Sequence, residues 1–187
     1  MAAPAALPWT LVYGGLTALY SLGLKKVALL DVFIVAAGYV LRVLAGSAAA
    51  QVKASHWLLL CTFFLALFLA LSKRRSELAA RGSAARPSLG EMPVSLLEAF
   101  ENIALGTTIV AYALYTVAPE TVAWFRTDGL LATVPIVVFG LFRWRLLEAR
   151  GGGEDATKDL FTDAGLLATV VIWGTVCAFF IYGPGRN

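Results

Sequence analysis

The chain has 187 residues, 59% of them hydrophobic and 14% charged, with a mean hydropathy of +0.78. Charged residues make up about 25% of an ordinary soluble domain, so this composition argues against a soluble protein and predicts a membrane protein. The net charge of +3 does not indicate nucleic-acid binding, because the bias of lysine and arginine toward alternate loops explains it, and the single histidine excludes a histidine-built metal site.

Six long apolar stretches follow one another along the chain. A helix needs about 20 apolar residues to cross about 30 Å of hydrocarbon. The sequence therefore predicts an all-α polytopic transmembrane bundle with spans at Ala5–Leu22, Val27–Ala50, His56–Ser72, Val94–Ala118, Gly129–Leu147 and Ala164–Tyr182. Candidate N-caps accompany four of these spans: Ser55, Ser95 with Glu98 at capping-box spacing, Thr127-Asp128 and Thr162-Asp163.

Lysine and arginine gather on alternate loops between these spans. The first, third and fifth loops with their flanks hold Lys25, Lys26, Lys73, Arg74, Arg75, Arg81, Arg86, Arg143, Arg145, Arg150 and Lys158. The other two loops and the C-terminal tail hold only Lys53, Arg126 and Arg186. Cytoplasmic loops carry an excess of basic residues. The odd-numbered loops are therefore predicted to face the cytoplasm, and any chemistry is expected on that side, where all acids but Glu120 and Asp128 also lie.

The second span contains two charged residues, Asp31 at its cytoplasmic end and Arg42 well inside. They are eleven residues apart, which places them on one face of a helix together with Gly38. An arginine inside a membrane helix costs at least ~2.5 kcal/mol unless it finds a partner or a cavity. One interpretation is an interhelical ion pair. The favoured one is a binding site for an anionic ligand, with Arg42 and Asp31 sharing a cytoplasmic cavity on a central helix rich in small residues.

The third loop carries the densest charge, Lys73-Arg74-Arg75-Ser76-Glu77 followed by Arg81 and Arg86. Anionic lipid head groups explain most such clusters, whereas guanidinium groups also suit phosphate ligands through bidentate hydrogen bonds. Consecutive helical residues point about 100° apart. We therefore expect that Lys73, Arg74 and Arg75 do not all enter one cavity.

The sequences of several segments resemble those of the UbiA-type membrane prenyltransferases, and within them the decaprenyl-phosphate phosphoribosyltransferase branch. The matching segments are Tyr20–Lys25, Leu30–Val32, Ala37–Arg42, Ala45–Gly46, Ser72–Leu78, Val134–Ile136, Gly140–Arg143, Asp155–Thr157 and Phe161–Asp163. The resemblance implies a nine-helix fold with a cavity open to the cytoplasm. Residues 1–187 would be one UbiA-like domain that matches the last six helices and lacks the first three, together with their aspartate-rich motif.

The resemblance also implies a reaction, the transfer of a phosphoribosyl group from phosphoribosyl diphosphate to polyprenyl phosphate at a bacterial plasma membrane. The implied cofactor is Mg²⁺, whose main ligands are missing from this sequence, so no metal ligand is assigned. The expected substrate- and phosphate-binding residues are Tyr20, Lys25, Asp31, Arg42, Lys73, Arg74, Arg75 and Glu77. Five aromatic residues are expected to line an opening for the isoprenoid: Phe63, Phe64, Phe68, Tyr112 and Tyr115.

Three interpretations stay open at this point. The first is a family transferase, for phosphoribosyl transfer or a related UbiA-type prenyl transfer, whose N-terminal three helices are absent from this sequence through truncation, a split gene or a misplaced start codon; an N-terminal three-helix fragment would then be its partner. The second is a non-catalytic membrane protein that binds polyprenyl phosphate or a partner transferase. A small transporter is a third possibility, but it predicts an inverted second half, and the six spans show no internal similarity. The sequence contains no nucleophilic triad, glycine-rich phosphate loop or thiolate metal site, so hydrolase, kinase and redox functions have no support.

Overall fold

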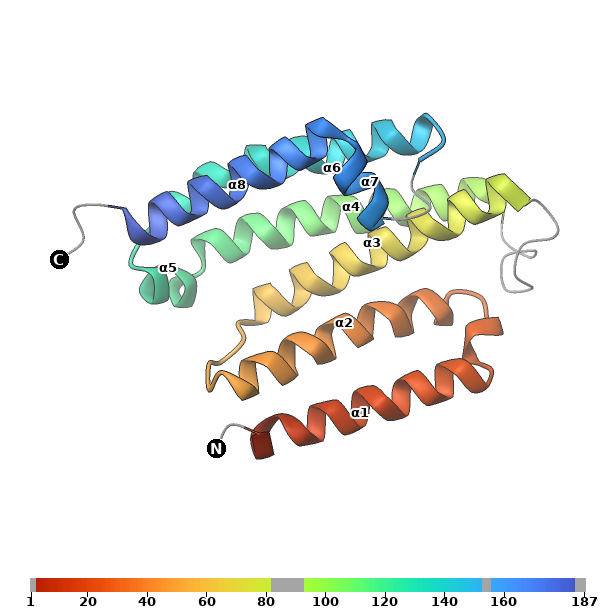
Figure 1. The fold of residues 1–187 in the computed structure, drawn as a ribbon, viewed down its shortest axis with the longest axis horizontal. Helices are drawn as coiled ribbons and strands as arrows, with labels where there is room; N and C mark the ends of the chain where they lie inside the picture. The colour runs from red at the N-terminus through yellow and green to blue at the C-terminus, as the bar shows by residue number, and fades with distance from the viewer. Residues whose placement is uncertain (1–2, 82–92, 153–155, 184–187) are drawn as a thin grey trace.

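The computed structural model describes residues 3–81, 93–152 and 156–183, and every regular element within these ranges is helical (Figure 1). The elements are α1 (Ala3–Leu22), η1 (Leu24–Lys26), α2 (Leu30–Ala49), α3 (His56–Arg81), α4 (Val94–Val117), α5 (Pro119–Phe125), η3 (Gly129–Thr133), α6 (Val134–Ala149), α7 (Ala156–Thr162) and α8 (Ala164–Tyr182). Each predicted span coincides with one long helix, the fifth being η3 and α6 together. The all-α polytopic fold class is confirmed.

Five helical segments in the described part of the chain are long and apolar enough to cross a membrane: Leu30–Ala49, His56–Ala79, Val94–Val117, Gly129–Ala149 and Ala164–Tyr182. The helix α1 is equally long and carries no charge, but it is not among them. Its proline, glycine and tyrosine residues lower its apolar character. At most a third of each segment is buried inside the protein, so most side chains of these helices face outward, as expected for contact with lipid.

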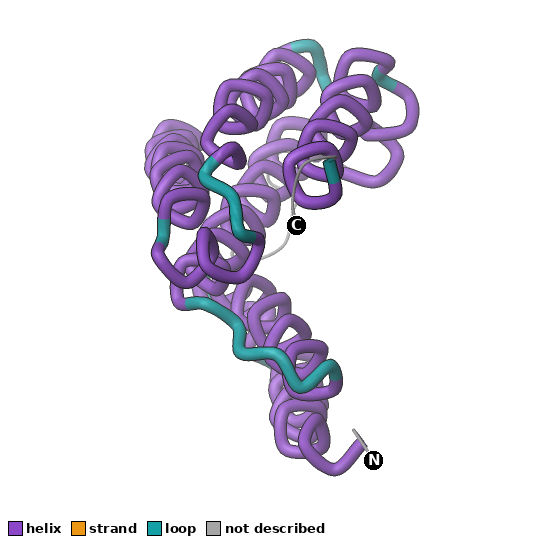
Figure 2. The backbone as a smooth tube through the Cα atoms, turned by 90° about the vertical axis from the view of Figure 1, so that its left-hand side faces the viewer, coloured by secondary structure: helices purple, strands orange, loops and turns teal. Residues whose placement is uncertain are grey.

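The long helices pack mainly against their neighbours in the chain. The helix α1 packs on α2, α2 on α3, and α3 on α4, while α6 packs on α8. Figure 2, turned by 90°, shows that this row bends into an arc with α1 at one end and the α6–α8 pair at the other. The prediction that the second span is central is wrong, because α3 and α4 share the most extensive contact and hold the middle of the row.

The core lies where α2, α3, α4, α6 and α8 meet. It is built from Val32, Ala36, Phe68, Leu71, Leu97, Ala104, Leu105, Leu141, Trp144 and Leu166. Phe68 and Leu97 have no exposed surface. Burying a large apolar side chain stabilises a protein in water by about 1.5–3 kcal/mol, but apolar lipid removes most of that gain, so close packing matters more here.

The helix ends show which sequence signals determine local structure. The hydroxyl of Ser55 accepts a hydrogen bond from the Leu58 N–H at 3.1 Å, and the carboxylate of Asp163 accepts one from the Leu166 N–H at 2.8 Å, so both predicted caps are confirmed. The capping box at Ser95 and Glu98 is wrong, because α4 begins directly after Pro93 with no side-chain cap.

The basic segment 73–77 is helical rather than part of a loop. The helix α3 continues past Ser72, the predicted end of the third span, to Arg81. Lysine, arginine, glutamate and alanine are good helix formers, so nothing in this segment stops the helix. The segment is therefore held rigidly on α3. Arg86 and Asp155, two residues of interest in the sequence, lie outside the described residues.

Candidate functional site

Arg74 stands at the centre of a buried polar cluster between α1, α2 and α3. Its Nε lies 2.7 Å from Oδ2 of Asp31, and its Nη1 lies 2.8 Å from Oε2 of Glu77. Its Nη2 donates a longer hydrogen bond of 3.4 Å to the hydroxyl of Tyr20. Arg74 is 5% exposed and Asp31 2%. The structure thus brings together four of the residues predicted for the site, and we call them the Arg74 cluster.

Arg75 enters a second cluster, which lies between α3, α4 and α6. Its Nε lies 2.7 Å from Oε2 of Glu101, and its Nη2 lies 3.0 Å from Oε2 of Glu148. Nη1 of Arg145 approaches Oε1 of Glu101 to 2.7 Å and Oε2 of Glu148 to 2.8 Å. Both glutamate side chains are completely buried. We call Arg75, Glu101, Arg145 and Glu148 the Arg75 cluster; each arginine lies within 3.0 Å of both glutamates.

Neutral polar groups extend the Arg75 cluster, Ser72 and Trp144 toward the core and Asn102 toward the surface. The Ser72 hydroxyl donates to Oε1 of Glu148 and accepts a 3.1 Å hydrogen bond from the indole N–H of Trp144. The Arg145 guanidinium also donates to Oδ1 of Asn102 at 3.0 Å. A buried charged network is tolerated only when its members are paired and hydrogen-bonded, and this one is almost fully satisfied.

Sequence reasoning missed most of the Arg75 cluster. It had not assigned Glu101, Arg145 or Glu148 to a site, although each carried a signal. Glu101 is an acid inside an apolar span, which marks an intramembrane carboxylate with a partner or a function. Arg145 and Glu148 are three residues apart, which puts them on one face of a helix as an ion pair.

Two other predicted residues remain apart from both clusters. Lys73 is exposed on α3, and Lys25 is exposed on η1. The expectation that Lys73, Arg74 and Arg75 take different directions is confirmed: the two arginines turn to different helices and the lysine to the outside. Among the described residues, no group of three or more histidine, cysteine, aspartate or glutamate side chains is placed to hold a metal ion.

Arg42 lies away from the arginine clusters. It lines a cavity of about 260 Å³ between α1 and α2, together with Tyr13, Tyr20, Gly38 and other residues of those helices. Asp31 is not among the lining residues, so the prediction that both charges share this cavity is wrong. The reason is that the Asp31 carboxylate turns to Arg74 of α3 instead.

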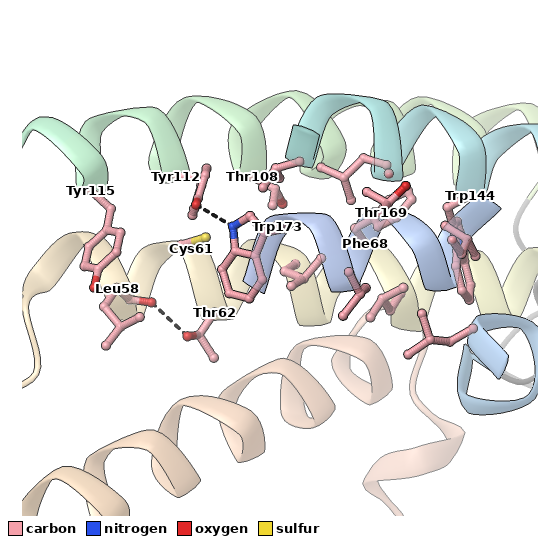
Figure 3. A pocket seen from close by; sticks show the side chains of 18 residues that line it. Leu58, Cys61, Thr62, Phe68, Thr108, Tyr112, Tyr115, Trp144, Thr169 and Trp173 are labelled. Atoms are coloured by element: carbon pink, nitrogen blue, oxygen red, sulfur yellow. Dashed lines mark hydrogen bonds between the residues drawn. The ribbon is translucent and has the colours of Figure 1, made fainter. Parts of the chain in front are cut away.

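A larger apolar groove of about 590 Å³ lies between α3, α4, α6 and α8, with Leu160 of α7 at its side (Figure 3). Figure 3 shows Tyr115 and Leu58 at one end and Trp144 at the other. The Trp173 indole N–H donates to the Tyr112 hydroxyl at 2.7 Å, which occupies both groups within the groove wall. Trp144 lines the groove and donates to Ser72, which in turn donates to Glu148, so hydrogen bonds join the groove wall to the Arg75 cluster.

The aromatic residues predicted to line an opening divide into two groups. Phe68, Tyr112 and Tyr115 line the groove. Phe63 and Phe64 do not; they contact each other edge to face, and Phe63 contacts Phe33 of α2 in the same way. Phe63 therefore takes part in the packing of α2 on α3, and Phe64 supports its ring from the same helix.

No family model matches this chain. It is 31% identical over 144 residues to the decaprenyl-phosphate phosphoribosyltransferase of Mycolicibacterium smegmatis, a match that covers 70% of this chain and 45% of that protein. The proteins of the same name from Mycobacterium tuberculosis and Corynebacterium glutamicum are 28% identical over 135 residues and 33% over 107 residues. They cover 70% and 56% of this chain, and 45% and 32% of their own lengths.

The chain thus spans less than half the length of the curated relatives it matches. These matches confirm the resemblance to decaprenyl-phosphate phosphoribosyltransferases that the sequence segments predict.

Proposed function

We propose, from this relationship to the decaprenyl-phosphate phosphoribosyltransferases, that the chain takes part in phosphoribosyl transfer to a polyprenyl phosphate. The observation that carries the proposal is the apolar groove whose wall residue Trp144 is joined by hydrogen bonds, through Ser72 and Glu148, to the partly exposed arginines Arg75 and Arg145. A polyprenyl phosphate has the same two parts, a long hydrocarbon and a doubly charged head.

The groove suits the hydrocarbon part because its wall is almost entirely apolar. Leu65, Phe68, Leu69, Leu141 and Val170 are among its lining residues. A ligand in a bilayer gains little from the hydrophobic effect, so shape and close contact would select an isoprenoid over straight lipid chains. The phosphate of a lipid at the Trp144 end of the groove would then lie on the side of the Arg75 cluster, to which Trp144 is joined through Ser72.

The reaction itself needs few covalent roles from the protein. An oxygen of the lipid phosphate attacks the anomeric carbon of the donor, and the bond from that carbon to the diphosphate oxygen breaks. The diphosphate leaves with the bonding electrons. The protein must hold two anions in line and stabilise the charge that grows on the leaving group. We assign the lipid phosphate to the Arg75 cluster and the diphosphate to Arg74 and Tyr20, with Lys25 and Lys73 as nearby exposed cations.

Magnesium, which the resemblance implies, does not fit the carboxylates described here. Asp31 and Glu77 both bind Arg74, and Glu101 and Glu148 bind Arg75 and Arg145. Magnesium takes carboxylate oxygens together with substrate phosphates in a near-octahedral shell, which these paired groups do not offer. We therefore assign no step to a metal on these residues and propose that the three-helix segment implied by the resemblance, with its aspartate-rich motif, supplies its ligands.

Ligand binding tests the proposal without requiring turnover. The purified chain in nanodiscs should bind polyprenyl phosphate more tightly than the corresponding polyprenol, as measured by native mass spectrometry. Arg145→Lys keeps the charge but loses the planar fork that holds a phosphate, so it should weaken binding of the phosphate about tenfold and leave the alcohol unchanged. Arg126→Lys, on the predicted outer side, is the matched control.

Two results would be decisive against the proposal. Equal binding of the phosphate and the alcohol would show that the arginines do not recognise the head group. If Arg145→Lys lost binding of both the phosphate and the alcohol, Arg145 would have a structural role only. Binding of the phosphate without any transfer, even when the three-helix segment is present, would favour the non-catalytic alternative.

A further inference from the structure

Arg42 differs from the other arginines in the membrane-spanning helices. Arg74, Arg75, Arg143 and Arg145 each lie within 3.0 Å of a carboxylate oxygen. Among the described residues, no carboxylate comes within ion-pair distance of Arg42. Its side chain is nevertheless exposed on the surface of a helix that is apolar enough to cross the membrane. A charge in this position needs a partner.

The groups that contact Arg42 satisfy only some of the hydrogen-bond donors of its guanidinium. One Nη donates a hydrogen bond to the Tyr13 hydroxyl of α1. The guanidinium carbon lies 4.9 Å from the centre of the Tyr13 ring and 5.2 Å from the centre of the Tyr39 ring. A guanidinium carries five N–H donors, so one hydroxyl and two ring faces leave most of them available to an anion.

The depth of the Arg42 guanidinium in the membrane determines which kind of anion can reach it. Side chains on a helix lean toward its N-terminus, and Arg42 contacts Tyr39, one turn earlier on α2. It also contacts Tyr13, which lies near the middle of α1. The guanidinium is thus turned away from the nearer end of α2 and held at mid-membrane depth. Lipid head groups lie about 15 Å from the middle of a bilayer, which is out of reach.

The surroundings of Arg42 leave room for a partner. The cavity of about 260 Å³ beside it is lined only by α1 and α2. Most of α1 is exposed, because it packs mainly on α2. We define the Arg42 face as Tyr13, Thr17, Tyr39 and Arg42, which line this cavity with polar groups from two adjacent helices.

We propose that the Arg42 face binds a partner transmembrane helix that carries an aspartate or glutamate at mid-membrane depth. A carboxylate there would form a charge-assisted pair with Arg42, which is among the strong hydrogen bonds available in proteins. The Tyr13 hydroxyl would become free to donate to the same carboxylate. This interaction does not depend on the proposed transfer reaction, and its test contains no substrate.

The test uses synthetic helices as probes. Polyleucine peptides of about 20 residues with one central glutamate, glutamine or leucine are labelled and mixed with the purified full chain in phosphatidylcholine vesicles. Association is measured by energy transfer. The glutamate peptide should bind at least about tenfold more tightly than the leucine peptide. Arg42→Met should abolish this preference, Arg42→Lys should retain part of it, and Arg126→Met, which removes a charge outside the membrane, should leave it unchanged.

Tyr13→Phe adds an internal check: it removes the hydroxyl that would donate to the same carboxylate, so it should reduce the preference for the glutamate peptide, but by less than Arg42→Met does. Equal association of the three peptides would overturn the proposal. So would a glutamate preference that survives in Arg42→Met. A preference that disappears when phosphatidylglycerol is added to the vesicles would also overturn it, because Arg42 would then serve a lipid head group.

Discussion

Arg74 and Arg75 are consecutive in the chain, yet their guanidinium groups bind carboxylates on different helices. Arg74 turns to Asp31 of α2 and Arg75 turns to Glu101 of α4. Consecutive helical residues point about 100° apart, so one turn of α3 joins both of its neighbours in the row. The basic segment therefore has a structural role in addition to any role in phosphate binding.

This arrangement predicts unequal effects of charge removal along the segment. Arg74→Met should lower the free energy of unfolding by about 3–5 kcal/mol, because it leaves Asp31 buried without its cation. Lys73→Met, at the exposed neighbouring position, should change it by less than about 0.5 kcal/mol. The double variant Asp31→Asn/Arg74→Met should recover much of the loss. Thermal unfolding in detergent measures all three, and equal losses for the two single variants would contradict the prediction.

The groove predicts a dependence on ligand length. Leu65→Trp adds volume to a residue that lines the groove and should weaken binding of a long polyprenyl phosphate about tenfold. A short prenyl phosphate that occupies only the end near Trp144 should bind as before. The matched control is Leu60→Trp, on the same helix but 42% exposed and not part of the groove wall. Equal weakening of the short and the long ligand would contradict this use of the groove.

The interactions of Asp163 predict the pH range over which its carboxylate stabilises the start of α8 to a constant extent. The Arg143 guanidinium, followed by the Leu166 N–H, lowers the pKa of Asp163 from its ordinary value of 3.8 to about 2. A lowered pKa in the folded state means that the stabilisation is fully present above the ordinary pKa and is lost as the pH falls through the folded value. The difference in Tm between the wild type and Asp163→Asn should therefore be the same at pH 5 and pH 8.

Below about pH 4 this difference should shrink, since a protonated aspartate and an asparagine carry no charge. Asp163→Ala removes the cap itself and should lower the Tm more than Asp163→Asn at every pH. A difference between wild type and Asp163→Asn that changes between pH 5 and pH 8 would show that another group controls this helix end.

The loop charges predict the orientation of the chain. Single cysteines introduced at Lys25 and Arg150 should react only with thiol reagents on the cytoplasmic side, and cysteines at Lys53 and Arg126 only with reagents outside. The background carries Cys61→Ala and Cys177→Ala, because both native thiols are free. Labelling intact cells and inverted vesicles with a membrane-impermeant maleimide gives the result. Reaction of Lys53→Cys from the cytoplasm would reverse the assigned orientation.

The paired carboxylates predict that this chain on its own turns over little or not at all. A single well-placed electrostatic contact contributes about 2.7–4 kcal/mol of transition-state stabilisation, and a metal site should contribute more. Adding a three-helix segment with the aspartate-rich motif should give transfer that depends on Mg²⁺. The measurement is phosphoribosyl transfer by the purified chain with and without that segment. Full Mg²⁺-dependent turnover by the chain alone would contradict the prediction.

The helices could be predicted from the sequence because apolar length and local caps determine them. The side chains of Ser55 and Asp163 each accept a hydrogen bond from the backbone N–H three residues later. A short-range sequence pattern was therefore sufficient to predict both helix starts. The end of α3 could not be placed in the same way. Hydrophobicity stops at Ser72, but helix propensity does not, and the basic residues continue the helix to Arg81.

The pairing of charges was less predictable, because it depends on which helices are neighbours. Asp31 and Arg42 share a helix face, and this suggested a shared cavity, but Asp31 lies beside α3 and meets Arg74. Glu101 and Glu148 are far apart in the chain and come together only because side chains of α4 and α6 both reach Arg75 of α3. No local pattern contains that information.

The distribution of charges over the helices has a consequence for synthesis and insertion. Proteins are made from the N-terminus, so helices become available in chain order. Arg74 finds Asp31 on a helix already made, and Arg75 is matched as soon as α4 brings Glu101. The helix α6 then brings Arg145 and Glu148 together as its own neutral pair. When the helices assemble in this order, each arginine of the two clusters finds a carboxylate partner either at once or after one further span has been added.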